Sequence, residues 1–244
     1  IIDMLHNIYS ERIIADPILD PPGKGTLFKS MQTYMKIKQI YPNIPLLMGL
    51  GNITELVDAD SVGMNMLLTL FAQELGVSLL LVTEESTKTQ GSVKETAIAS
   101  QMNTISWIKH TPPKDLGIDL LILKDKRRAK TLFDITRDTK VVDIRDTWYT
   151  DIKTKTDPVG FFKIRVNYSE QVIEALYIGR KGRILIRARS CKSIEKYILE
   201  NGLISMLSHA FYLGRELAKA EEALKINKNY VQEKPLFSLK KPIR

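Results

Sequence analysis

Two polar side chains, Asp16 and Asn52, stand at the ends of apolar stretches of similar design. A carboxylate accepts hydrogen bonds from N–H groups, whereas an asparagine amide both donates and accepts them. Gly49 and Gly51 precede Asn52 and would let a ligand approach the backbone closely. These four residues therefore predict a site that binds a ligand through hydrogen bonds.

Each polar residue also has a purely structural interpretation. Asp16 could cap a local turn before Pro17, a role that aspartate often fills. Asn52 could occupy a left-handed turn position after the two glycines. Glu84 and Glu85, which end a third apolar stretch, either reach the same site or lie in a solvated loop.

Three short apolar stretches, at residues 13–16, 46–49 and 77–82, are predicted to be buried strands. Segments with helical spacing of apolar residues follow them, at 27–41, 61–75 and 91–107. This alternation is typical of parallel strands joined by right-handed crossovers. Both an open sheet and a closed β/α barrel satisfy the pattern, and both place the strand ends along one edge.

The segment 61–75 carries boundary signals of a helix. Ser61 can cap its first turn, and Gly76 is well placed as its C-terminal stop. The apolar face expected for this helix consists of Val62, Met66, Leu67, Leu70, Phe71 and Leu75.

The second half of the chain has a different pattern. Apolar or alternating stretches at 118–123, 141–144, 161–166, 172–178 and 184–188 predict strands of an antiparallel meander. The segment from Gly179 to Gly182 is predicted to be a hairpin turn between the last two of them. Two helices are expected next, at 191–200 and 203–226, before an extended tail.

The balance of charge changes sign along the chain. Residues 1–110 hold 8 Lys and Arg against 11 Asp and Glu, whereas residues 111–244 hold 28 against 17. The run Thr111-Pro112-Pro113 predicts a stiff linker at this boundary. We therefore predict two domains, 1–110 and 111–244, of which the second is basic and attracts polyanions in general.

The composition excludes several classes of protein. No apolar run reaches the roughly 18 residues needed to cross a bilayer, and no signal peptide is evident. The single cysteine, Cys191, cannot form an intrachain disulfide, which fits a reducing cytoplasm. No metal site is predicted, because His6, His110 and His209 lie far apart without clustered ligands. The chain starts at Ile1 within an apparent helix, so we expect it to be a piece of a longer protein.

Two motifs resemble the pterin-binding barrel superfamily, namely Asp16-Pro17-Ile18-Leu19 and Gly49-Leu50-Gly51-Asn52-Ile53-Thr54. That group includes dihydropteroate synthases and corrinoid-linked methyltransferases that use methyltetrahydrofolate. Residues 13–105 and 209–221 look like parts of archaeal dihydropteroate synthase-related proteins, which carry a C-terminal domain of unknown function. The resemblance implies an α/β fold, the C-terminal part of a (βα)8 TIM barrel whose first five strands are missing, followed by a smaller α+β domain.

The resemblance also implies roles for the motif residues. Asp16 would accept N–H bonds from the edge of a pterin ring, and Asn52 would bind near N5 and act in catalysis. Gly49 and Gly51 would complete the cofactor-binding loop, although Gly51 stands where the methyltransferase motif has serine. The family's other pterin ligands, an Asp and an Asn, belong to strands that this chain lacks.

The implied function is methyl transfer from N5 of a methyl-tetrahydropterin to a corrinoid protein. The pterin would be tetrahydromethanopterin or tetrahydrofolate, in archaeal one-carbon metabolism. The corrinoid would arrive on a partner protein, because the chain lacks an Asp-x-His-x-x-Gly signature. The resembled families also imply a homodimer.

Two other functions stay open. A dihydropteroate synthase-type enzyme of methanopterin biosynthesis would join a pterin pyrophosphate to an arylamine, but such enzymes usually carry Ser-Arg-Lys in the loop occupied here by Gly49–Asn52. The second alternative is a non-catalytic module whose basic half binds nucleic acid or an acidic partner. Few aromatic residues lie among its alternating cations, such as Arg183 and Arg187, so a solvated sheet face is expected rather than a nucleic-acid site.

Overall fold

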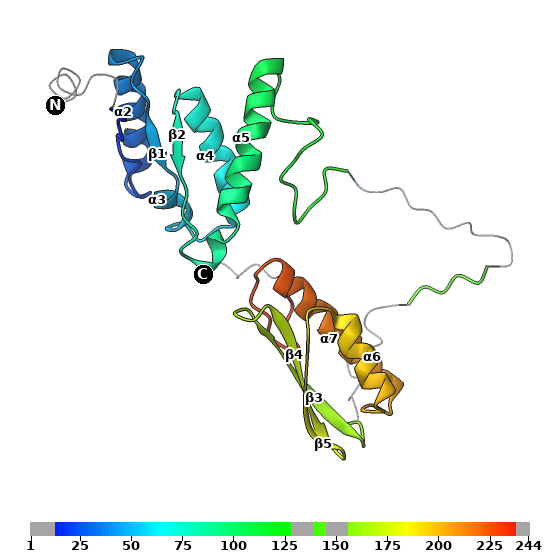
Figure 1. Cartoon of the computed structure of the whole chain (residues 1–244). Helices are drawn as coiled ribbons and strands as arrows, with labels where there is room; N and C mark the ends of the chain where they lie inside the picture. The colour runs from blue at the N-terminus through cyan, green and yellow to red at the C-terminus, as the bar shows by residue number, and fades with distance from the viewer. Residues whose placement is uncertain (1–12, 128–138, 145–155, 238–244) are drawn as a thin grey trace. The chain divides into compact units, whose positions relative to one another are not determined.

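The structure is a computed structural model that describes residues 13–127, 139–144 and 156–237. The chain divides into two compact units, Ile1–Lys130 and Thr131–Arg244, here called unit 1 and unit 2 (Figure 1). The helix predicted at the start of the chain lies outside the described residues.

Unit 1 alternates helices with short parallel strands, as the sequence predicts. Strand β1 (Leu47–Gly49) pairs with β2 (Leu79–Leu81), and Ala15 forms an isolated parallel bridge with Leu46. Because Leu47 donates its N–H to Ala15 while the Leu46 carbonyl accepts from Leu79, β1 lies between the other two segments. The helical elements are α2 (Thr26–Ile40), α3 (Gly51–Thr54), α4 (Ser61–Glu74), the 3-10 turn η1 (Thr87–Thr89) and α5 (Ser92–Lys109).

The core of unit 1 forms around β1. Leu46, Met48 and Leu50 are fully buried, and Tyr34 of α2 and Leu68 of α4 pack into the same cluster. The burial expected for the stretch 46–49 is thus confirmed at Leu46 and Met48. The burial expected for the other two stretches was wrong, because Ile14, Leu79 and Leu81 are 54%, 41% and 55% exposed. Two paired strands and one bridge form an open sheet within the described residues, so the eight-stranded barrel stays a prediction.

Helix α4 does not bury the face that its sequence predicts. Leu67 and Phe71 of the expected apolar face are 51% and 36% exposed. The buried side instead carries Asn65, with Ser61, Leu68, Thr69 and Ala72. The prediction was wrong because α4 has no charged residue before its last position, Glu74, so no polar stripe marks the solvent side. Ser61 is also not the cap, since Asp60 precedes the helix and the Ser61 hydroxyl bonds to Glu95 (2.8 Å).

Unit 2 is a three-stranded antiparallel sheet that two helices cover on one face (Figure 1). Its strands run in the order β3 (Gly160–Asn167), β4 (Val172–Gly179) and β5 (Gly182–Ala188), and its helices are α6 (Cys191–Glu200) and α7 (Leu207–Lys225). Gly179 pairs with Gly182, which confirms the predicted hairpin turn. The inward residues of the sheet pack on α6 and α7 around Ile173, Tyr177 and Leu217, which are fully buried.

Three predictions for the second half of the chain were wrong. The stretches 118–123 and 141–144 form no strand, and their apolar side chains such as Leu121 and Val141 are more than half exposed. Apolar composition alone does not make a strand, because the backbone needs a neighbouring strand to pair with. Helix α7 also begins at Leu207 rather than at 203, since Asp157 accepts the N–H groups of Ser205 and Met206 in an extended segment.

Candidate functional site

Asp16 lies where the Ala15 bridge ends, on the carboxyl side of that segment. Its Oδ1 accepts the N–H of Ile18 (2.9 Å), so Asp16 does form the turn considered as its structural role. The hydroxyl of Tyr34 also donates to Oδ1 (3.4 Å) and to the carbonyl of Leu47 (3.0 Å). Oδ2 has no hydrogen bond within the described part of the chain, so the exposed carboxylate keeps an oxygen available to a ligand.

Tyr34 is the neighbour of Asp16 that sequence reasoning did not identify. Burial raises the pKa of the Tyr34 phenol, and the charge of Asp16 raises it further. The phenol therefore stays protonated, and its one O–H bonds mainly to the Leu47 carbonyl while it also faces the Asp16 carboxylate. In the sequence, Tyr34 was only one aromatic residue at helical spacing on α2. Such a residue more often packs in the core than binds a ligand.

Asn52 lies directly after β1, in the one-turn helix α3. The segment was predicted to be a loop, and Asn52 is helical rather than left-handed. Its Nδ2 donates to the carbonyl of Leu19 (2.7 Å). That bond fixes the orientation of the amide and leaves Oδ1 and the second N–H without a partner among the described residues.

The Leu19 carbonyl links the two predicted site residues. Asp16 opens the Asp16–Leu19 segment and Asn52 bonds to its end, so both residues border the same turn at the carboxyl ends of adjacent parallel segments. Gly49 is near them too, since a Cβ placed there would lie 4.0 Å from Nδ2 of Asn52, which is ordinary contact.

The packing of the surrounding protein explains why residue 51 is a glycine. A Cβ at Gly51 would lie 2.4 Å from Oγ1 of Thr83, a β-branched side chain that donates to Glu55 (3.1 Å). The serine of the resembled motif therefore does not fit at this position unless Thr83 moves.

We expect Gly51→Ala to destabilise unit 1 by about 1–3 kcal/mol, because the new methyl group overpacks against Thr83. In a Thr83→Ala background the same change should be neutral or stabilising by up to about 1 kcal/mol, because alanine favours the helix. Hydrogen exchange of the β1 amides in this double-mutant cycle measures the difference. If Gly51→Ala destabilises the protein equally in both backgrounds, the contact with Thr83 is not the reason for a glycine at position 51.

Glu55 organises the loop after β2, and no sequence signal singled it out. Its carboxylate accepts bonds from the hydroxyls of Thr83 (3.1 Å) and Thr89 (2.8 Å) and from the N–H groups of Glu85 (3.0 Å) and Ser86 (3.1 Å). Desolvation alone would raise the pKa of Glu55, but these hydrogen bonds lower it to about 2. Glu55 thus fastens the loop that borders the candidate site.

Glu84 and Lys88 of this loop also have structural partners. Glu84 accepts the N–H of Val93 (2.9 Å) at the first turn of α5, where a negative charge is favourable. Lys88 donates to the carbonyls of Thr54 (2.6 Å) and Val57 at the end of α3. Glu84 therefore stabilises the first turn of α5, and the Lys88 ammonium is already bonded to backbone carbonyls.

Replacing Glu55 with Gln should release the loop 83–89, seen as faster hydrogen exchange at Glu85 and Ser86. The native protein should show the same release in acid. A depressed pKa makes the contribution of Glu55 complete above the pKa of an unfolded glutamate, about 4.3. That contribution is then lost as the pH falls toward about 2. Glu74→Gln, on the exposed side of α4, is the matched control and should leave this exchange unchanged.

His209 packs in unit 2. Its Nδ1 lies 3.0 Å from Oδ2 of Asp157, and its ring lies against Phe162 and Tyr212, with centroids 6.0 and 6.2 Å away. Within the described residues no group of three or more His, Cys, Asp or Glu could hold a metal ion. None of the described helices is long and apolar enough to cross a membrane.

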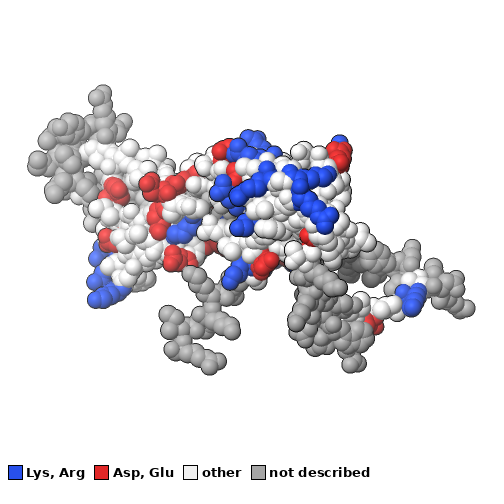
Figure 2. Space-filling view, turned by 90° about the horizontal axis from the view of Figure 1, so that it is seen from below, with Lys and Arg blue, Asp and Glu red and all other residues white. Residues whose placement is uncertain are grey.

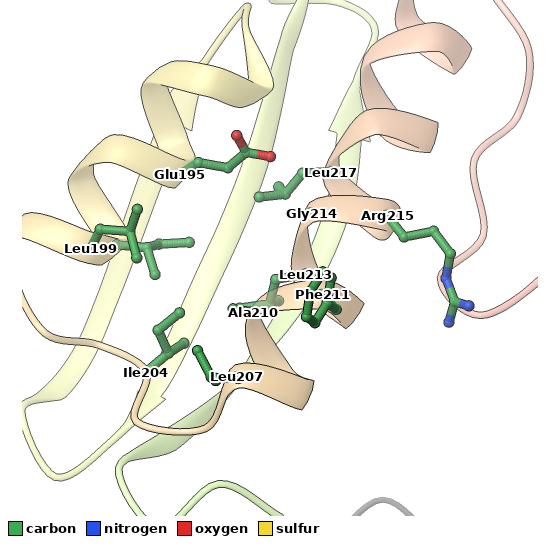
Figure 3. A pocket seen from close by; sticks show the side chains of 11 residues that line it. Glu195, Leu199, Ile204, Leu207, Ala210, Phe211, Leu213, Gly214, Arg215 and Leu217 are labelled. Atoms are coloured by element: carbon green, nitrogen blue, oxygen red, sulfur yellow. The ribbon is translucent and has the colours of Figure 1, made fainter. Parts of the chain in front are cut away.

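Unit 2 has a groove of about 450 Å³ between α6 and α7 (Figure 3). Its walls are apolar, with Leu199, Ile204 and Phe211 among them, and Glu195 and Arg215 are its charged members. A ring edge with several N–H and carbonyl groups would leave most of them unpaired against such walls. The groove therefore differs in chemistry from the polar site in unit 1.

Comparisons with known proteins match the two units differently. Residues 156–233, within unit 2, match the family model PterinBD-DUF4346, whose name refers to a pterin-binding domain. An uncharacterized protein of Methanocaldococcus jannaschii is 36% identical over 231 residues, which cover 93% of this chain and 43% of that relative. The chain thus spans less than half the length of the relative that it matches. No solved structure matches the chain. The chain is therefore similar to a longer archaeal protein, and unit 2 resembles a domain from a pterin-binding family.

Proposed function

We propose that unit 1 is the C-terminal part of a pterin-binding (βα)8 barrel, and that the complete protein transfers a methyl group from N5 of a methyl-tetrahydropterin to a corrinoid protein. The observation that carries the proposal is the placement of Asp16 and Asn52 around one turn, at the ends of adjacent parallel segments. The match of unit 2 to a pterin-binding family model supports a pterin as the ligand.

The atoms of these residues that have no partner within the described chain suit the edge of a pterin. The free oxygen of Asp16 can accept an N–H bond, and a charge-assisted bond of this kind is worth roughly 1.5–3 kcal/mol. Asn52 offers an acceptor and one N–H, and the Leu19 carbonyl holds both in a fixed orientation. When the methyl group leaves N5, its bonding electron pair stays on that nitrogen. A fixed donor there stabilises the transition state more than the ground state.

A dihydropteroate synthase reaction is less compatible with the same residues. Departure of pyrophosphate requires cations, and the Ser-Arg-Lys of such enzymes is absent from the loop after β1. Lys88, the cation beside α3, is held by the carbonyls of Thr54 and Val57. Failure to complement a synthase-deficient strain is the expected result.

Calorimetry of the complete protein tests the proposed ligand. We expect methyl-tetrahydromethanopterin or methyl-tetrahydrofolate to bind, and Asp16→Ala to weaken that binding. Asp58→Ala, at an exposed position after α3, is the control and should bind normally. Absence of binding at millimolar ligand would remove the proposal.

A further inference from the structure

The two edges of the unit 2 sheet differ in what covers them. Along β3, the Gln232 side chain accepts the N–H of Ile164 (2.8 Å) and donates to the carbonyl of Phe162 (3.2 Å). The same tail is held by buried Glu216, which accepts the hydroxyl of Tyr230 (2.9 Å) and a backbone N–H (3.0 Å). The chain's own tail therefore occupies the β3 edge at Phe162 and Ile164.

The β5 edge is open within the described residues. Among them this strand pairs with β4 alone, so its alternate residues turn their N–H and C=O groups away from the sheet. In the part of the chain that the structure describes, no further hydrogen bond reaches the backbone of residues 182–188. An uncovered edge of this kind can pair with another extended chain.

The side chains on the outer face of β5 determine which kind of extended chain can pair with this edge. Arg183, Leu185 and Arg187 are all exposed, and they alternate with Ile184 and Ile186, which face the helices. Arg183 has no ion pair among the described residues, whereas Arg187 contacts Glu170 and Glu174. Figure 2 shows many of the visible Lys and Arg side chains in one central area, with a smaller separate group at the lower left.

Two other occupants fit this edge poorly. A second copy of β5 would set arginine against arginine, and like charges directly opposite one another destabilise a pair of strands. A single-stranded nucleic acid needs aromatic side chains on which its bases stack. On the outer face of the three described strands, Phe161 is the one aromatic residue, and Leu176, Ile178 and Leu185 beside it are aliphatic.

We propose that the β5 edge binds an extended acidic segment of a partner protein, which adds to the sheet as a fourth strand. Two acidic side chains four residues apart would lie opposite Arg183 and Arg187, which are about 13 Å apart along the strand. Arg183 provides the main charge contact, because Arg187 already contacts Glu170 and Glu174. An apolar side chain between them would lie beside Leu185. The two remaining side chains would face the side of Ile184 and Ile186, so they should be apolar as well.

The test uses the full chain and the synthetic peptide Ser-Glu-Ile-Val-Ile-Glu-Ser. We expect calorimetry to detect binding, and hydrogen exchange of the β5 amides to slow when the peptide is present. A peptide with Pro in place of Val should not bind, because it cannot pair with the edge although it keeps both charges. Arg183→Glu should weaken binding about tenfold. Its matched control, Arg215→Glu on α7, should not change it.

A reciprocal charge exchange makes the test specific. The peptide with Lys in place of both Glu should prefer the Arg183→Glu protein to the native one. The proposal is overturned if the acidic peptide does not bind at millimolar concentration, or if it binds without protecting β5. Equal binding of the Pro peptide also overturns it, as does binding of oligouridylate in place of the acidic peptide.

Discussion

Asn52→Ala is expected to slow methyl transfer by the complete protein about 100- to 1000-fold, the loss typical of removing one fixed donor from a developing charge. The alanine keeps α3 helical but removes both the bond to Leu19 and the atoms that face the turn. Since the proposed role lies in the transition state, the maximal rate should fall more than the affinity for the pterin. Single-turnover kinetics with the methyl-tetrahydropterin and a corrinoid protein measure the rate.

Asn43→Ala is the matched control for this change. Asn43 is an exposed asparagine on the amino side of β1, the opposite end of the strand from Asn52. Its replacement should leave the rate unchanged. Equal rates for the native and Asn52→Ala proteins would contradict a catalytic role for the amide. Unchanged pterin affinity in Asp16→Ala would separately contradict the binding site.

Asp157→Asn is expected to destabilise unit 2 by about 2–4 kcal/mol. The Asp157 carboxylate is buried and accepts bonds from the N–H groups of Val159 (3.0 Å), Ser205 (2.8 Å) and Met206 (3.0 Å), and from the Ser205 hydroxyl (2.6 Å). It also contacts His209. An amide supplies one acceptor fewer and sets its own N–H groups against donors. The change should therefore loosen the start of β3 and the start of α7 together.

The same carboxylate should make the stability of unit 2 depend on pH. Burial alone would raise the pKa of Asp157, but the bonds from Ser205, Val159 and His209 hold it well below its usual range. A depressed pKa makes the contribution complete above the pKa of an unfolded aspartate, about 3.9. The contribution declines as the pH falls below that value, because folding then requires a proton to be released.

Hydrogen exchange of the β4 amides between pH 5 and about pH 3 measures this dependence. The native protein should lose protection as the pH falls, after correction for the intrinsic rate. Asp157→Asn should show a much smaller loss. Asp143→Asn, at an exposed position, should behave like the native protein. A native protein whose protection does not change over this range would contradict the assignment.

The sequence predicted the parts of the fold whose determinants are local. The hairpin at Gly179–Gly182 follows from turn residues between alternating strands, and Gly76 and Gly91 bound α4 and α5 as their backbone conformations require. The parallel arrangement of β1 and β2 follows from their alternation with helices. In each case the deciding residues lie within a few positions of one another.

Predictions failed where a distant segment decides the outcome. The stretch 118–123 has the composition of a strand, but nothing in the described chain pairs with it. Helix α4 has no polar stripe, so its buried side is set by Glu95, which bonds to Ser61 and Asn65 from 30 or more residues away. Neither the composition nor the periodicity of a segment reveals which distant residues will contact it.

The candidate site likewise has some features that are local in the sequence and others that depend on tertiary contacts. The sequence by itself determined that Asp16 and Asn52 end apolar segments, because a buried strand and the polar residue after it are local features. Only the tertiary structure decided that both border the turn ending at Leu19, that the Tyr34 hydroxyl faces the carboxylate, and that Glu55 fastens the loop beside them. Those contacts join residues 18 to 33 positions apart and depend on how α2, β1 and β2 pack. Hydrogen bonds act over about 3 Å, so the packing of the elements selects which polar groups meet.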